Sequence, residues 1–217
     1  MEAISTQKLT HGTKQLVKKT IDSIENLLKK GMRHQTPVVI EYAQLVDVTK
    51  RLAVFAIKNF YDNLAREAVA NIGRSADMSF TYINRDKDRP VFTICDALAE
   101  IGISAATNGN EVICGQCINR HEEIIKRSKA KNAGSELEKP MASFLILVAY
   151  TWQSLEFMQD TLFDKLGQLK RESGLDYSNF IVSTKNILKS KSKRYKSIFD
   201  DFLDDIEDYQ RFEGEAE

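Results

Sequence analysis

The sequence has few of the residues that form turns or disulfide frameworks. Its 217 residues include 10 glycines, 3 prolines and 3 cysteines. Little glycine and proline argues against a turn-rich all-β fold and favours long helices. An odd, small number of cysteines does not suit the disulfide framework of a secreted domain, so it favours a reducing, cytoplasmic location.

Long apolar segments are also missing. The longest apolar run, FLILVAY over residues 144–150, is far below the roughly 20 residues that a membrane-spanning helix needs. The first residues, MEAISTQKLTHGTKQLVKK, are polar nearly throughout and do not resemble a signal peptide. We therefore expect an intracellular protein without a membrane span.

No single sign of charge dominates the chain. Its 31 basic and 31 acidic residues cancel, so the chain has no net charge that would attract it to nucleic acid or to an anionic membrane. The hydrophobic fraction of 42% and the charged fraction of 29% are typical of a folded globular protein. Any preference for a charged partner must arise from a local cluster.

Apolar residues recur at the helical period over most of the chain. The periodic segments are 13–30, 37–72, 91–105, 111–129, 141–172 and 178–209. The pattern predicts an all-α fold, an irregular multi-helix bundle with two long helices. The segment 37–72 alone would give a helix about 50 Å long at 1.5 Å per residue. SFTYI interrupts the helical pattern and is compatible with one short β element near residue 80.

The charge pattern suggests a division of the chain. We expect a helical bundle core over 1–174, a C-terminal charge-segregated helix over 175–210 and a disordered tail over 211–217. TNGN precedes the segment 111–129, and its last residue, Asn110, is placed to cap the helix that follows. No stretch of about 20 to 50 residues recurs with internal similarity, so the sequence carries no solenoid signature.

Cysteine and histidine gather in the segment EVICGQCINRHEEIIKR. Cys114, Cys117 and His121 share one helix face and, with Cys95 from the preceding helix, could supply the ligands of a structural zinc site. An unbroken helix, however, separates the Cα atoms of Cys114 and His121 by about 10 Å along its axis. The same stripe contains Ile118 and neighbouring isoleucines, so buried core cysteines are the favoured interpretation and metal binding is an alternative.

A redox site is a further alternative for the same cysteines. CGQC has the outline of a redox-active C-x-x-C motif, but such a motif needs a βαβ setting that the helical pattern does not offer. We therefore assign no metal and no cofactor.

Common catalytic motifs are missing. HEEII fails the H-E-x-x-H zinc protease pattern because its fifth residue is Ile125, and no P-loop or G-x-G-x-x-G occurs. We name no catalytic residue. Catalytic triads cannot be recognised from spacing alone, so the enzyme question stays open, with a non-enzymatic protein favoured.

Charge changes sign abruptly near the C-terminus. A basic run, which contains Lys185, Lys189, Lys191, Lys193, Arg194 and Lys196, is followed by acidic residues from Asp200 onwards. Part of the run is neutralised if Lys196 and Asp200 pair at i, i+4. Three interpretations compete: a solvated amphipathic helix, a docking element for an oppositely charged partner or a second copy, and nucleic-acid contact with Tyr195 stacking on a base.

These observations predict a non-enzymatic helical interaction or assembly protein, which self-associates or serves as an accessory subunit of a complex. A nucleic-acid-associated accessory protein that uses the 185–196 run is the alternative. A structural zinc protein that uses Cys114, Cys117 and His121 is the third. The expected partner is a protein or a second copy, with nucleic acid second.

Overall fold

The structure is a computed structural model that describes residues 39–82, 89–130, 137–173, 177–189 and 193–215, together with Gln15, Lys18, Lys19, Asp22 and Asn26. Its elements are α2 (Val39–Lys58), α3 (Asp62–Tyr82), α4 (Arg89–Thr107), α5 (Glu111–Ala130), α6 (Glu138–Ser154), the 3-10 turn η2 (Glu156–Met158), α7 (Gln159–Ser173), α8 (Tyr177–Leu188) and α9 (Lys193–Glu215). The described ranges contain no strand, which confirms the all-α prediction.

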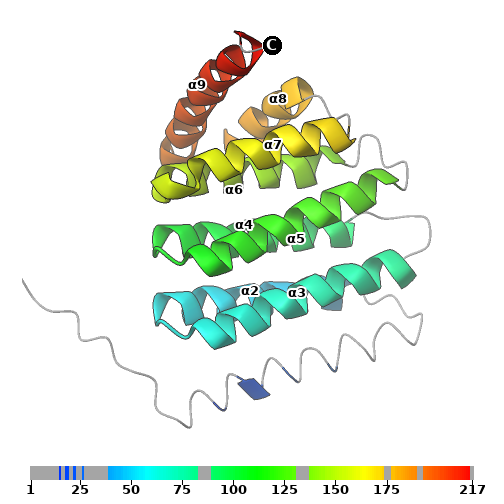
Figure 1. Cartoon of the computed structure of the whole chain (residues 1–217). Coiled ribbons are helices and arrows are strands. Elements are labelled where there is room, and N and C mark those ends of the chain that lie inside the picture. Colours follow the sequence, from blue (N-terminus) through cyan, green and yellow to red (C-terminus); the bar gives the residue numbers. More distant parts are fainter. Residues whose placement is uncertain are drawn as a thin grey trace, which may run out of the picture.

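Consecutive helices pair into hairpins that stack in layers (Figure 1). The pairs α2–α3, α4–α5 and α6–α7 lie one above the other, and α8 and α9 pack against α6. Helices α2, α4, α6 and α8 contact one another in order and form one side of the stack. The first three of them begin at residues 39, 89 and 138, about fifty residues apart, although the sequence shows no repeat. The bundle is therefore more regular than its sequence indicates.

The predicted single helix over 37–72 is in fact two helices. Phe60 has a left-handed φ of 59°, and α2 ends there. The amide of Tyr61 donates to Ala56 O at 2.8 Å and the amide of Phe60 donates to Ile57 O at 3.1 Å, which is the Schellman pattern of a helix end. The sequence hides this turn because phenylalanine occupies the position that usually holds glycine.

The α4–α5 turn repeats the same motif with glycine. Gly109 has a φ of 69°, and the amide of Asn110 donates to Ala105 O at 2.8 Å. The side-chain Oδ1 of Asn110 accepts from the amide of Ile113 at 3.2 Å, which confirms its predicted role as the N-cap of α5. Its Nδ2 also donates to Asp62 Oδ1 at 2.8 Å and so ties this turn to the first residue of α3.

Two other long periodic segments are also interrupted. The segment 141–172 breaks at Leu155, which has the non-helical angles φ −133° and ψ 75°, and continues through η2 into α7. The segment 178–209 is divided between α8 and α9. The two long helices are therefore not confirmed.

Other predictions concern the region near residue 80 and the two ends of the chain. The β element is not confirmed, because residues 79–82 belong to the last turn of α3. Helix α9 runs to Glu215, into the range expected to be a disordered tail. The division at residue 174 stays a prediction. The helix predicted over 13–30 lies mostly outside the described residues.

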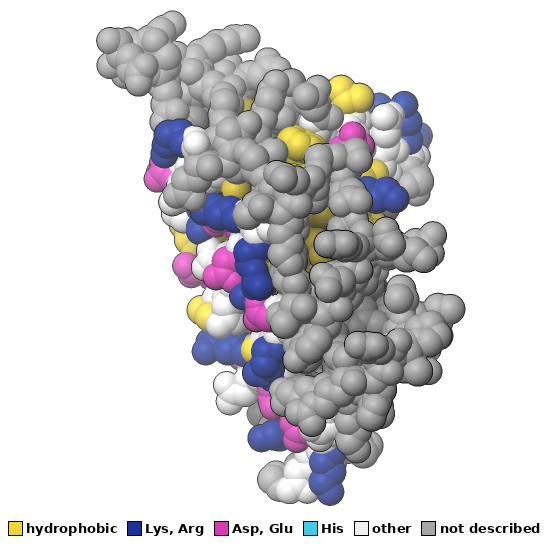
Figure 2. Space-filling view, turned by 90° about the vertical axis from the view of Figure 1, so that its right-hand side faces the viewer, with side chains coloured by type: hydrophobic (Ala, Val, Ile, Leu, Met, Phe, Trp, Pro, Cys, Tyr) yellow, Lys and Arg dark blue, Asp and Glu magenta, His cyan; other side chains and the backbone are white. Residues whose placement is uncertain are grey.

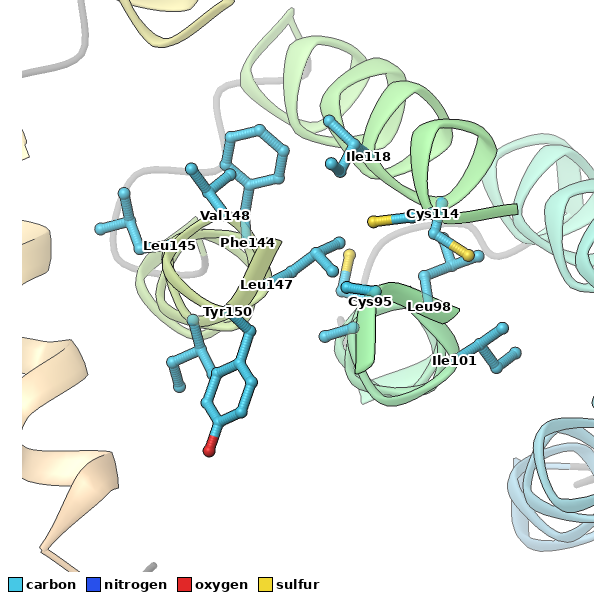
Figure 3. Close-up of a cluster of buried hydrophobic side chains, with 14 of the residues drawn as sticks. Cys95, Leu98, Ile101, Cys114, Ile118, Phe144, Leu145, Leu147, Val148 and Tyr150 are labelled. Atoms are coloured by element: carbon cyan, nitrogen blue, oxygen red, sulfur yellow. The ribbon is translucent and has the colours of Figure 1, made fainter. Parts of the chain in front are cut away.

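Helix α6 is the centre of the core. Every residue over 140–151 is buried, as expected for a helix enclosed by neighbours on all sides. Figure 3 shows Leu147 of α6 beside Cys95 of α4, and Phe144 of α6 on the side of Ile118 of α5. Helix α4 approaches closely at Gly102, where an added Cβ would lie 2.5 Å from Leu147 Cδ1. None of the described helices has the length and apolar character needed to cross a bilayer.

Candidate functional site

The predicted zinc candidates lie in the core between α4, α5 and α6. Cys95, Cys114, Cys117 and His121 are all fully buried. In Figure 3, Cys95 of α4 and Cys114 of α5 lie beside Leu98 and Leu147. Across the described ranges, no group of three or more histidine, cysteine, aspartate or glutamate side chains is arranged to hold a metal ion. The burial of these residues agrees with the core interpretation.

His121 is held as a neutral ring. Its Nε2 lies 3.0 Å from Pro140 O, and since a carbonyl only accepts, Nε2 carries the hydrogen. The ring meets Phe144 edge to face, with centroids 5.3 Å apart. Burial lowers the pKa of His121 to about 4, although the hydrogen bond to Pro140 O opposes the shift. This histidine contributes to packing and is not exposed as a general base.

The cysteines are held as neutral thiols. Thr151 Oγ1 donates its hydrogen to Leu147 O at 2.8 Å, so the thiol of Cys114 is the donor in its 3.1 Å contact with Thr151 Oγ1. Burial raises the pKa of Cys114 to about 11, against a weaker lowering by Thr151. Burial also raises the pKa values of Cys95 and Cys117 strongly. Thiols that stay protonated are poor nucleophiles.

The basic run is only partly available to a partner. Lys189, Lys193 and Lys196 are exposed at the α8–α9 turn. Tyr195 is half-buried, and its ring centroid lies 4.7 Å from that of Tyr150, so it is not free to stack on a base.

Other members of the run are paired or not described. Lys185 Nζ lies 3.7 Å from Asp200 Oδ1. Asp200 therefore pairs with Lys185, whereas the sequence predicted that it would pair with Lys196. Lys191 and the side chain of Arg194 lie outside the described part of the chain.

Charges elsewhere on the stack connect one hairpin to the next. Arg120 of α5 forms an ion pair with Asp77 of α3 and donates to Gly73 O at 2.7 Å. Lys50 of α2 lies 2.9 Å from Glu100 of α4. Figure 2 shows basic and acidic side chains interspersed over the described part of the visible face. The described residues of that face therefore form no continuous patch of one sign.

A groove of about 440 Å³ crosses the side of the stack formed by α2, α4 and α6. Its apolar lining includes Val54 of α2, Phe92 and Ile103 of α4, and Ile146 of α6. Ile187 of α8 and Tyr195 of α9 also line the groove.

Charged side chains of both signs accompany the apolar lining. They are Lys58, Asp96, Glu100 and Lys139. Lys139 Nζ lies 5.4 Å from the centroid of the Phe92 ring, a cation–π contact.

The groove was not predicted from the sequence. Val54, Phe92 and Ile103 are only half-buried, and they lie at the edge of the fully buried stripes of their helices. Apolar residues outside the main stripe are the signal that could have found it, because they make a second apolar face on the same helix. The sequence gives no indication of which helices would align these second faces.

A comparison of the chain with protein-family models, curated proteins and solved structures finds no match.

Proposed function

We propose that this is a non-enzymatic helical interaction or assembly protein, which self-associates or serves as an accessory subunit of a complex. The groove over α2, α4 and α6 is the observation that carries the proposal. Its apolar lining comes from successive hairpins, and charged residues of both signs flank it. Stacked helical repeats use such extended surfaces to bind other proteins.

The shape and chemistry of the groove suit a helical segment of another polypeptide. Packed helices lie about 8–10 Å apart, so a groove across three of them extends roughly 20 Å, a few helical turns. The apolar side chains that line the groove would pack against the apolar face of such a helix. Lysines and carboxylates at the rim would orient it. None of the described lining residues is a histidine or a cysteine, so the groove offers neither nucleophile.

The charged face of α9 alone is too weak to hold a second copy. Asp201, Asp204 and Asp205 are exposed beyond Lys193 and Lys196, so two antiparallel α9 helices could pair oppositely charged ends. Exposed ion pairs contribute only about 0.2–1 kcal/mol each. Association of two chains costs about 4 kcal/mol or more in lost translational and rotational freedom. We infer that α9 orients a partner and that the groove supplies the affinity.

Photo-crosslinking in cells tests the groove. A benzoylphenylalanine at position 103 would lie in the groove, and one at position 112 would replace Val112, an exposed residue of α5 outside it. We expect a crosslinked polypeptide of defined mass from position 103 and none from position 112. No crosslink from position 103, or equal crosslinking from both positions, would contradict the proposal.

Nucleic-acid association is a second candidate because Lys189 at the end of α8 and Lys193 and Lys196 in the first turns of α9 are all exposed. Retention on a DNA column should then fall with salt and be lost when Lys191, Lys193 and Arg194 become alanine. A control with Arg51, Arg66 and Lys126 replaced loses the same number of charges from other helices. Equal retention of the two variants would contradict this candidate.

A further inference from the structure

The outer face of the first hairpin exposes apolar side chains on α2. Lys50 contacts Glu100 of α4 and so marks the side of α2 that faces the second hairpin. A helix turns about 100° per residue, which places Val48, Leu52 and Phe55 on the opposite side. Val48 and Phe55 are each 42% exposed, and Leu52 is half-buried at the edge of the strip, where it also packs against the core. The described helices that pack closely against α2 are α3 and α4, and neither of them covers Val48 or Phe55.

The position of the strip at the end of the stack makes it unusual. Helix α4 is covered by α2 on one side and by α6 on the other. Among the described elements, helix α2 is covered by a helix of another hairpin on one side only, by α4. Stacked repeats bury their apolar faces against neighbours, and a terminal repeat therefore needs a cover with a polar outer face.

The chain provides a segment with these properties before α2. Within residues 13–30, the described residues Gln15, Lys18, Lys19, Asp22 and Asn26 are helical. All but Asp22 are exposed, and their spacing places the five on one side of a helix. The apolar residues of the segment fall on the other side by spacing: Leu16, Val17, Ile21, Ile24, Leu27 and Leu28.

We propose that the segment 13–30 docks its apolar side on the strip formed by Val48, Leu52 and Phe55 and caps the first hairpin. Residues 31–38 connect the segment to α2 and can reach roughly 27 Å when extended, enough for the segment to fold back along the helix. The polar residues from Gln15 to Asn26 then form the outer surface of the stack.

This contact goes beyond the groove because it uses a different side of α2. Val54 and Lys58 line the groove, whereas Val48 and Phe55 form the strip. Release of the segment would leave an apolar strip at the end of the stack that a second copy could bury. The cap therefore prevents end-to-end association of the chain, independently of whatever the groove binds.

Limited trypsin digestion of the full chain tests the contact. Lys18, Lys19, Lys29 and Lys30 provide cleavage sites within the segment. Phe55→Glu should weaken the cap and raise cleavage at these sites by about tenfold or more, because proteolysis follows the population of the open form. Phe157→Glu changes another exposed phenylalanine, outside the strip, and should leave cleavage unchanged. Equal cleavage in the wild type and in Phe55→Glu would overturn the proposal.

Crosslinking identifies the occupant of the strip. Phe55→Cys is combined with Ile24→Cys on the apolar side of the segment or with Asn26→Cys on its polar side, and a bismaleimide joins the two thiols. The native cysteines are buried and remain unmodified in the folded chain. We expect an intrachain link with Ile24→Cys and little with Asn26→Cys. A link between two chains would show a second copy on the strip, and either that result or no link would overturn the proposal.

Discussion

At the scale of single residues, the buried imidazole of His121 makes the stability of the fold depend on pH. The fold favours the neutral form of this ring, because burial lowers its pKa to about 4, below the unfolded value of 6.5. As pH falls below the unfolded pKa, the unfolded chain takes up a proton that the folded chain does not. The contribution of His121 is therefore complete above about pH 6.5 and is lost as pH falls towards about 4.

This linkage gives a measurable prediction. Between about pH 6 and pH 5, protonation of His121 in the unfolded chain should lower the free energy of unfolding by roughly 1 kcal/mol per pH unit. Urea unfolding of the wild type and of His121→Leu at several pH values isolates this term, because all other groups are shared. The variant should show a shallower decline over this window. Identical slopes in the two proteins would contradict a buried neutral ring.

At the scale of elements, the hairpin turns show why helix boundaries were only partly predictable. The segments 91–105 and 111–129 correspond closely to α4 and α5, because TNGN provides both a glycine stop and an asparagine cap between them. The turns at Phe60 and Leu155 contain neither glycine nor proline, and the apolar stripe continues through them. Periodicity therefore predicts the helices but not these breaks, which tertiary packing determines.

The two Schellman turns provide a matched pair of substitutions. Phe60 adopts the left-handed conformation that glycine tolerates best, and its side chain is 72% exposed. Phe60→Gly should therefore stabilise the protein by up to about 1 kcal/mol, whereas Gly109→Ala should cost about 1 kcal/mol. Thermal unfolding monitored by circular dichroism measures both. A loss of stability in Phe60→Gly would contradict a turn at this position.

Glycines inside α4 and α5 test the packing between helices. A Cβ at Gly102 would lie 2.5 Å from Leu147 Cδ1 and 3.1 Å from Cys117 Cβ, both fully buried residues. Gly102→Ala should cost about 1–3 kcal/mol through overpacking. Gly115 of α5 has no atom within 4 Å of an added Cβ, so Gly115→Ala should stabilise the protein by about 0.5–1 kcal/mol. Denaturant unfolding distinguishes the two, and equal effects would contradict the α4–α6 contact.

At the scale of the whole molecule, the stack places residues together that the sequence keeps far apart. Val54, Phe92, Ile103 and Ile146 come from three hairpins and share one groove. Composition and periodicity predicted an all-α fold, and the core interpretation of the cysteines agrees with their burial. The groove could not be predicted, because it depends on how three hairpins align their second apolar faces.

We propose that this protein acts by binding another polypeptide. Native mass spectrometry of the protein, isolated from its own cells without chelator and at low salt, tests the claim most directly. We predict a complex whose mass equals this chain plus a second copy or another protein. A single bare chain, or a chain that carries only zinc or an oligonucleotide, would contradict it.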